Sequence, residues 1–165
     1  MLFRSPPFTG LSIKNPGYIS DYPAGIRENG AQYTHAAIWL SKAFYEIGDR
    51  EKGYEILSML NPINHSRTEM EADIYKTEPY VIAADVYYGG ENTGRGGWTW
   101  YTGSAGWYYR LCVENLLGIK RRGNVLFVNP SLPHEWHGKA TVRYRYGGKI
   151  YEVDLSKGSQ QITLA

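Results

Sequence analysis

A threonine, a glycine and a histidine are the residues of this sequence best suited to bind an anion. Thr102 and Gly103 begin the segment 102–107, which reads TGSAGW and has the composition of a helix start. A hydroxyl, a backbone N–H and the positive end of a helix dipole together form an anion site. Simple helix capping by Thr102 is the alternative interpretation, and the two roles are compatible.

His35 is the second candidate, at the start of another predicted helix. It lies off the apolar stripe of that helix and shares its face with Ile38, Trp39 and Lys42. An imidazole among aromatic rings, close to a helix start, can donate a hydrogen bond to an anion or to a sugar oxygen. A histidine whose hydrogen bonds are satisfied within the core is the alternative.

Tyr22, Arg27 and Glu28 precede the same helix. The charged pair is either a solvated helix start or a polar rim that binds sugar hydroxyls. The sequence contains 15 tyrosines and five tryptophans in 165 residues. Flat apolar rings with a polar tip match the C–H faces and hydroxyls of a pyranose, although a core with some amphipathic surface positions would use the same residues.

The helices and strands that must position these residues can be predicted from the spacing of apolar residues and from the proline and glycine residues that interrupt it. Apolar residues at helical spacing predict helices over about 29–47, 49–60, 77–88 and 103–117. In the first helix, Asn29 is the predicted N-cap, and the apolar stripe is Tyr33, Ala36, Ala37, Leu40, Phe44 and Ile47. After Gly118 the period becomes that of strands, at 124–128 and in a hairpin, 139–146 and 149–155, around Gly147-Gly148. The sequence therefore predicts a mainly helical region followed by a small β region.

Several classes of function are disfavoured by composition. A net charge of +2 gives no electrostatic case for nucleic acid or for an anionic membrane. One cysteine excludes an intrachain disulfide, and the four histidines lack metal-ligand spacing. The glycine-rich loop 89–97 has no following Gly-Lys-Ser/Thr, and no paired carboxylates stand out. Without an 18-residue apolar run or a signal-peptide pattern, we expect no membrane segment and a cytoplasmic chain, although a parent protein anchored in the inner membrane stays open.

A set of short strings extends these observations. They read GIRENG (25–30), YTH (33–35), TEPY (77–80), WYTGSAGW (100–107), LGI (117–119) and NPSLP (129–133), followed by Trp136. In order and spacing, and over nearly the whole chain, they resemble glycoside hydrolase family 94. This is the family of cellobiose phosphorylase and of the phosphorylase-like region of cyclic β-1,2-glucan synthases. The resemblance is marked for the branch of the glucan synthases and the β-1,2-oligoglucan phosphorylases.

The resemblance implies a fold and an activity. Residues 1–118 would be the last helical hairpins of an (α/α)6 barrel, and residues 119–165 a small antiparallel β C-terminal domain. The family cleaves a β-glucoside with inorganic phosphate and inversion, which yields α-glucose 1-phosphate without a cofactor. By position, His35, Thr102 and Gly103 resemble phosphate ligands. Tyr22, Arg27 and Glu28 resemble residues of the acceptor-side sugar pocket.

The resemblance covers only the C-terminal part of the family's enzymes. The general-acid aspartate and a phosphate-binding arginine belong to an earlier part of the barrel, so no catalytic residue is assigned here. We expect the chain alone to be inactive, with a β-linked gluco-oligosaccharide and phosphate as ligands. The alternatives are a carbohydrate-binding module without catalysis, or a subunit that completes a barrel with an upstream part or as a homodimer.

Overall fold

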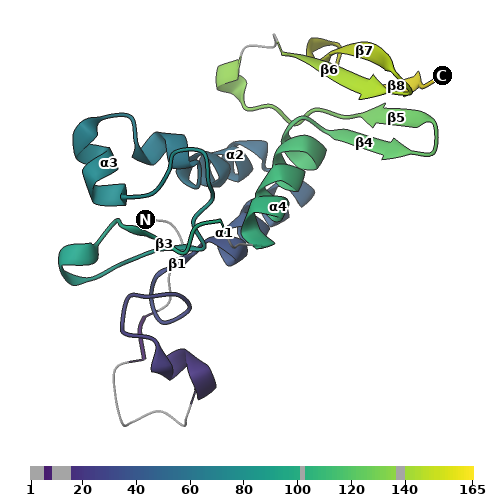
Figure 1. The fold of residues 1–165 in the computed structure, drawn as a ribbon. Helices are drawn as coiled ribbons and strands as arrows, with labels where there is room; N and C mark the ends of the chain where they lie inside the picture. The colour runs from purple at the N-terminus through teal and green to yellow at the C-terminus, as the bar shows by residue number, and fades with distance from the viewer. Residues whose placement is uncertain (1–5, 9–15, 101–102, 137–139) are drawn as a thin grey trace. The chain divides into compact units, whose positions relative to one another are not determined.

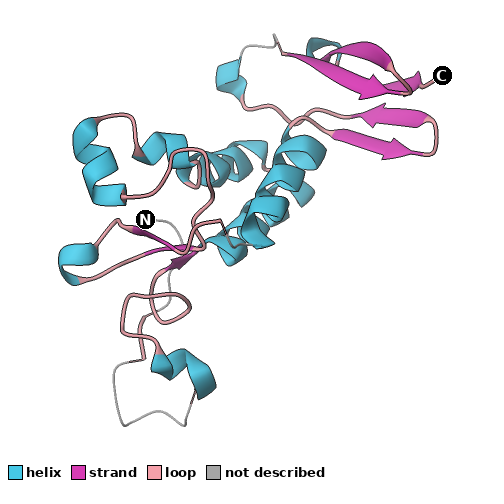
Figure 2. Cartoon of the chain, viewed as in Figure 1, coloured by secondary structure: helices cyan, strands magenta, loops and turns pink. Residues whose placement is uncertain are grey.

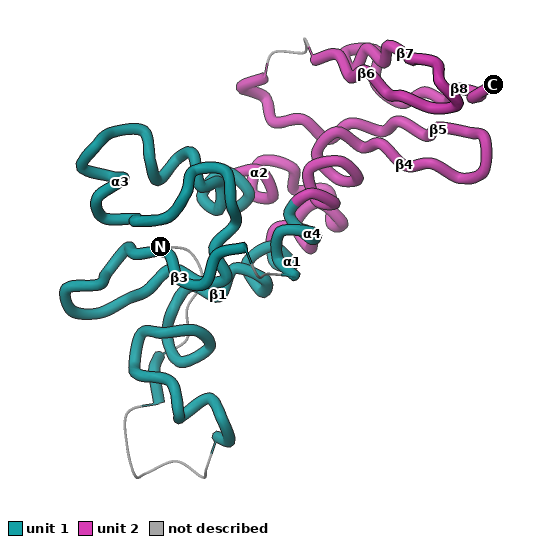
Figure 3. Tube along the Cα trace, in the orientation of Figure 1, with its two compact units in different colours: residues 1–40, 56–108 teal, residues 41–55, 109–165 magenta. Residues whose placement is uncertain are grey.

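The computed structural model describes residues 6–8, 16–100, 103–136 and 140–165. These residues contain four α-helices and small antiparallel sheets, with short 3-10 helices, a π-helix and loops between them (Figures 1 and 2). The predicted class, a helical region with a small β region, is confirmed. The chain divides into two compact units, residues 1–40 with 56–108 and residues 41–55 with 109–165 (Figure 3). The division at residues 118 and 119 expected from sequence stays a prediction.

The first two helices form the predicted hairpin. Helix α1 spans Thr34–Glu46 and helix α2 spans Arg50–Met59. Gly48, with φ of 87°, follows the first helix in a left-handed conformation that suits glycine. The Asp49 carboxylate then accepts a hydrogen bond from the Lys52 amide at 3.0 Å. Both ends of this short connection are therefore set by local residues.

The start of α1 differs from the prediction, because Asn29 does not cap it. The Asn29 side chain is buried, donates to the Tyr22 carbonyl at 2.7 Å and accepts from the Phe8 amide at 2.7 Å. Gln32–Tyr33 form a short strand, β1, and the helix begins at Thr34. The Asn29 side chain, predicted to cap the helix, therefore forms hydrogen bonds to other segments of the chain instead.

The buried face of α1 is also rotated from the predicted stripe. Its fully buried residues are Thr34, Ala37, Ile38, Ser41 and Tyr45, whereas Ile47 is 76% exposed. The reason is a close approach between α1 and α2. Ser41 Oγ donates to the Gly53 carbonyl at 2.7 Å, and a Cβ on Gly53 would lie 2.8 Å from the Tyr45 ring. The small residues Ser41 and Gly53 therefore decide which face of α1 packs against α2.

The helix predicted at 77–88 is wrong. A helix, α3, instead spans Glu69–Tyr75, started by a capping box between Thr68 and Glu71. Asp85–Val86 form strand β2, which pairs with β1 on one side and with β3, Gly96–Gly97, on the other. Backbone pairing to distant segments outweighs the helix signal of Thr77-Glu78-Pro79.

The glycine-rich loop supplies β3 and brings backbone close to side chains. A Cβ on Gly97 would lie 2.4 Å from the Tyr87 ring and 2.6 Å from Asp85 Oδ1. A Cβ on Gly96 would likewise clash with the Thr77 hydroxyl. At this loop the backbone therefore approaches neighbouring side chains closely, which glycine allows.

Helix α4 spans Gly103–Arg110 and continues as a π-helix, Leu111–Leu116, as predicted for 103–117. The β region that follows contains β4 (Ile119–Arg122), β5 (Val125–Val128) and β8 (Gln160–Thr163) in one antiparallel sheet. The hairpin β6–β7, Thr141–Tyr146 and Lys149–Asp154, turns at Gly147-Gly148 as predicted. The sequence analysis missed β4 and β8. The core here consists of Ile119, Leu126, Val128, Val153, Leu155 and Leu164.

Candidate functional site

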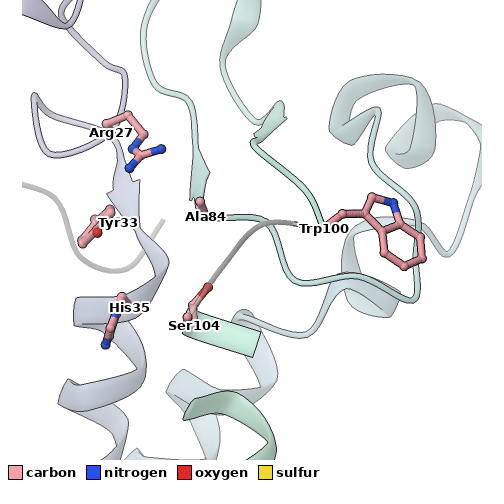
Figure 4. Close-up of a pocket in the computed structure, with 7 residues that line it drawn as sticks. Arg27, Tyr33, His35, Ala84, Trp100 and Ser104 are labelled. Atoms are coloured by element: carbon pink, nitrogen blue, oxygen red, sulfur yellow. The ribbon is translucent and has the colours of Figure 1, made fainter. Parts of the chain in front are cut away.

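The first unit contains a pocket of about 410 Å³. The described residues that line it are Arg27, Tyr33, His35, Ala84, Trp100, Gly103 and Ser104. They come from three separate parts of the chain: the approach to α1 and its first turn, the segment around β2 and β3, and the first turn of α4. In Figure 4, Arg27, Tyr33 and His35 lie on one side and Ala84, Ser104 and Trp100 on the other. Among the lining residues are three that the sequence analysis assigned to ligand binding.

His35 occupies the first turn of α1, and the small sheet fixes that turn. The Thr34 amide donates to the Ala84 carbonyl at 3.0 Å, which ties the helix start to β2. The imidazole packs edge-on against Trp39, with ring centroids 4.8 Å apart, and lies 6.2 Å from Trp107. His35 Nε2 is buried and has no hydrogen-bond partner among the described residues. A buried, unpaired ring nitrogen is free to bind a ligand.

The start of α4 meets the start of α1 at this pocket. A Cβ placed on Gly103 would lie 3.9 Å from His35 Cε1, so the two helix starts are in contact. Ser104 is buried, and its Oγ also lacks a partner among the described residues. Thr102 lies outside the described residues. The convergence of an imidazole with the N-terminal end of a helix gives the pocket the donors that an anion requires.

Arg27 contributes the positive charge of the site. Its backbone is left-handed, with φ of 51°, and its amide donates to Asp85 Oδ2 at 2.7 Å. The guanidinium carbon lies 4.8 Å from the centroid of Trp98 and 5.7 Å from that of Tyr22. Arg27 Nε lies 3.8 Å from Glu28 Oε2. The Tyr33 ring is 6.0 Å from the same carbon, so three aromatic rings and one carboxylate orient the guanidinium.

Tyr33 adds a hydroxyl donor to the lining. Burial raises the pKa of Tyr33 above its ordinary value, and the nearby Glu28 carboxylate adds to this effect. The phenol keeps its proton at neutral pH, and a side-chain hydrogen bond to Glu28 is one of the causes of the raised pKa.

Asp85 is the buried carboxyl that fixes the backbone of Arg27. It is completely buried, its Oδ2 accepts from the Arg27 amide, and Oδ1 has no partner among the described residues. Burial raises the pKa of Asp85, while the hydrogen bond from the Arg27 amide and the Arg27 charge partly oppose this shift. The carboxyl positions Arg27 by a backbone hydrogen bond and does not line the pocket.

The raised pKa of Asp85 predicts a pH dependence of stability. The folded state binds this proton more tightly than the unfolded chain does. The stabilisation is therefore complete below the ordinary carboxyl pKa of about 4, and it is lost as pH rises through the raised value. Asp85→Asn keeps an oxygen acceptor for Arg27 but cannot ionise. We expect its free energy of unfolding, relative to the unsubstituted chain, to increase from pH 4 to pH 8 in urea titrations; parallel profiles would contradict this.

The sequence analysis placed some site residues correctly in space and missed others. Arg27, His35 and Gly103 line the pocket, while Tyr22 and Glu28 contact Arg27 without lining it. Their roles in ligand binding stay predictions. Ser104, Tyr33, Trp100 and Ala84 were not assigned. Tyr33 stands in the string YTH, and Trp100 and Ser104 stand in the string WYTGSAGW, which was the available signal.

Among the described residues, no group of three or more His, Cys, Asp or Glu residues is arranged to hold a metal ion. In the same part of the chain, no helix combines the length and the apolarity needed to cross a membrane.

Known proteins are similar in sequence to this chain. The model of the "Glycosyl hydrolase 94 superfamily, catalytic domain" matches residues 1–118. The cyclic beta-(1,2)-glucan synthase NdvB of Rhizobium meliloti is 48% identical over 147 residues, which are 89% of this chain and 5% of that protein. Cellobionic acid phosphorylase of Neurospora crassa is 27% identical over 161 residues, 93% of this chain and 20% of that protein. The 1,2-beta-oligoglucan phosphorylase of Listeria innocua is 30% identical over 126 residues, which are 68% of this chain and 12% of that protein.

The chain therefore spans a fifth or less of the length of these relatives. The family match nevertheless includes the helices and the loops that build the pocket. It ends at residue 118, where the sequence analysis placed the change from helices to strands. The strings that carried the resemblance and the matched family agree, and the chain belongs to the glycosyl hydrolase 94 superfamily.

Proposed function

We propose that this chain is the phosphate-binding C-terminal part of an inverting β-glucoside phosphorylase. One observation carries the proposal: two helix starts converge, so that His35 Nε2 and Ser104 Oγ lie buried and unpaired beside Gly103 in a pocket that Arg27 also lines. Unpaired buried donors cost free energy unless a ligand binds them. An oxyanion at the N-terminal end of α4 would satisfy both.

Each residue has a role in this proposal. The imidazole of His35, the backbone at Gly103 and the hydroxyl of Thr102 hold phosphate, and Ser104 adds a donor. Arg27 binds hydroxyls of the acceptor-side sugar, oriented by Tyr22 and Glu28. A phosphate oxygen attacks the anomeric carbon from the face opposite the glycosidic oxygen, which departs with a proton. The products are α-glucose 1-phosphate and the shortened saccharide.

The proton donor is proposed to lie outside this chain. None of the described residues that line the pocket is an aspartate or a glutamate. The helices of the chain would then be the last hairpins of an (α/α)6 barrel whose earlier part carries the general acid. General acid catalysis is worth about 10²–10⁴-fold in rate, so the chain alone should release little or no glucose 1-phosphate.

Phosphate binding by the chain tests the proposal. We expect His35→Ala to weaken inorganic phosphate binding at least about tenfold, because a hydrogen bond to a charged group contributes roughly 1.5–3 kcal/mol. Calorimetry or phosphorus NMR titration of the 165-residue chain measures this. His134→Ala is the matched control, because His134 is an exposed histidine of the other unit.

Three outcomes count against the proposal. One is phosphate binding that His35→Ala leaves unchanged, and another is an equal loss in His134→Ala. The third, rapid release of glucose 1-phosphate from a β-1,2- or β-1,4-gluco-oligosaccharide by this chain alone, contradicts the external general acid.

A carbohydrate-binding module is the second candidate, and exposed aromatic rings favour it. Trp39, Tyr80 and Trp100 are 52%, 74% and 72% exposed. This candidate would be supported if saccharide binding changed neither on addition of phosphate nor in His35→Ala. The donors of the first pocket would then have no role in binding.

A further inference from the structure

The net charge of +2 is the sum of two parts of opposite sign. Residues 119–165 contain eight Lys and Arg and three Asp and Glu, a net charge of +5, whereas residues 1–118 have a net charge of −3. Three of the basic residues are consecutive, Lys120, Arg121 and Arg122, and they form most of strand β4. Neither the family match, which ends at residue 118, nor the proposed phosphate site explains this concentration of positive charge.

A pocket of about 330 Å³ lies at this basic strand. The described residues that line it are Val113, Glu114, Ile119, Lys120, Arg121, Arg122 and Tyr144, and all of them belong to the second unit. Strand β4 is the edge strand of the sheet β4–β5–β8 (Figure 1). Successive side chains of a strand point to opposite faces, so a pocket that all three basic residues line lies at the open edge of the strand, where both faces meet.

The two arginines are held in place by groups that leave their charge uncompensated. Arg121 Nη1 donates to the Gly123 carbonyl at 3.2 Å, and the guanidinium carbon lies 5.0 Å from the ring centroid of Tyr146. The guanidinium carbon of Arg122 lies 5.9 Å from the ring centroid of Phe127. Among the described residues, no carboxylate forms an ion pair with either arginine. A guanidinium has five N–H donors, so both side chains keep donors for an anion.

The carboxylate of the lining, Glu114, is already bound. Its two oxygens accept from Arg110 Nε at 2.9 Å and from Arg110 Nη2 at 3.1 Å. These hydrogen bonds hold the pKa of Glu114 below its ordinary value, and the charge of Lys120 adds to the shift. Glu114 is therefore compensated by Arg110 and in part by Lys120, and the lining keeps an excess of positive charge from the two arginines.

The chemistry of the lining selects a phosphate group. Guanidinium groups form paired hydrogen bonds with phosphate and carboxylate oxygens. A phosphate monoester has a charge of about −1.5 to −2 at pH 7 and three acceptor oxygens, so it matches several cations better than a single carboxylate does. Val113, Ile119 and Tyr144 add apolar surface for the organic part of such a ligand.

We propose that Lys120, Arg121 and Arg122 bind the phosphate group of a phosphate monoester at the open edge of β4. The site is distinct from the one at His35, because its residues belong to the second unit, and it does not depend on the proposed function. A soluble sugar phosphate and the headgroup of phosphatidic acid both offer this group, and the experiment separates these two sources.

The test is a titration of the His35→Ala chain with α-glucose 1-phosphate, followed by amide and phosphorus NMR. We expect binding to persist in this variant, with amide shifts at residues 119–122; the same shifts in the unsubstituted chain report the site if the variant does not fold. Arg122→Gln should weaken binding about tenfold, because it removes charged hydrogen bonds to the phosphate. Arg145→Gln is the matched control, because Arg145 is an exposed arginine of strand β6 that does not line the pocket.

Vesicles of phosphatidylcholine, with and without phosphatidic acid, distinguish the two sources. Sedimentation of the chain with phosphatidic acid alone, without binding of α-glucose 1-phosphate, would assign the site to the lipid headgroup. Binding of the sugar phosphate alone would assign it to a soluble ligand. Either result supports the proposal if Arg122→Gln reduces it more than Arg145→Gln does.

Three results overturn the site at β4. One is the absence of shifts at residues 119–122 with either probe, and another is an equal loss of binding in Arg122→Gln and Arg145→Gln, which would indicate only a general field. The third is self-association of Arg122→Gln with unchanged ligand binding, because the basic residues would then only protect an edge strand from pairing. Loss of phosphate binding at His35 with binding at β4 intact would overturn the proposed function alone.

Discussion

Gly25→Ala is expected to lower the free energy of unfolding by at least about 3 kcal/mol and to abolish ligand binding in the first pocket. A Cβ on Gly25 would lie 1.5 Å from the Tyr88 carbonyl oxygen, and φ at this residue is 90°. The same backbone accepts from the Tyr88 amide at 2.9 Å and donates to the Asn29 carbonyl at 2.7 Å. Because the clash is with backbone, no side-chain movement relieves it.

The loss should reach the site because Gly25 leads directly into Arg27. Separating the segment of Gly25 from that of Tyr88 would shift Arg27 away from Asp85, to which its amide is bonded. Urea unfolding measures the stability, and hydrogen exchange at the Tyr88 amide reports the local contact. Gly17→Ala is the control: φ is 73° there, but nothing lies within 4 Å of the added Cβ. It should cost only the left-handed strain, about 1 kcal/mol. Equal effects of the two variants would show that the close contact has no energetic weight.

Gly118→Ala should have a comparable effect in the second unit. Its Cβ would lie 1.9 Å from the Asn129 carbonyl oxygen and 2.6 Å from Pro130 N, at φ of 68°. The Asn129 amide donates to the Gly118 carbonyl at 2.9 Å, just before β4 begins at Ile119. We expect a loss of at least about 3 kcal/mol, because the substituted residue would push β4 away from the end of β5.

The control for Gly118 is Gly123→Ala, in the turn between β4 and β5. Gly123 has φ of 60°, and no atom lies within 4 Å of its added Cβ, so about 1 kcal/mol of strain is expected. Thermal and urea unfolding of both variants, followed by tyrosine fluorescence and circular dichroism, provide the comparison. A Gly118→Ala chain as stable as Gly123→Ala would refute the argument that backbone contact, and not φ alone, requires glycine here.

Features that depend on neighbouring residues were predictable. The Gly147-Gly148 turn acts over a few residues and was found where expected. The Asp49 cap and the left-handed Gly48 are likewise local features. The helix at 103–117 was also predicted, because its apolar period is sustained over more than three turns. The resemblance to family 94, carried by strings in order along the chain, was confirmed by the family match over residues 1–118.

Features that depend on distant residues were not predictable in the same way. Asn29 looks like a helix cap, yet its amide bonds Tyr22 and Phe8. Residues 77–88 look helical, yet Asp85–Val86 pair with Gln32–Tyr33 and Gly96–Gly97. In each case long-range backbone pairing or packing outweighs a local preference worth about 1 kcal/mol or less.

The candidate site also has features that the sequence predicts and features that only the tertiary structure decides. Sequence by itself determined which residues have the chemistry to hold an anion: a histidine near one helix start, and a threonine-glycine pair at another. It left capping and ligand binding open for Thr102, because a helix start looks alike in both cases. Only the tertiary structure brought Gly103 against His35 and left His35 Nε2 and Ser104 Oγ without partners in the described chain. The physical reason is that 68 residues separate these helix starts, and their contact is set by the sheet β1–β2–β3, whose pairing no local pattern encodes.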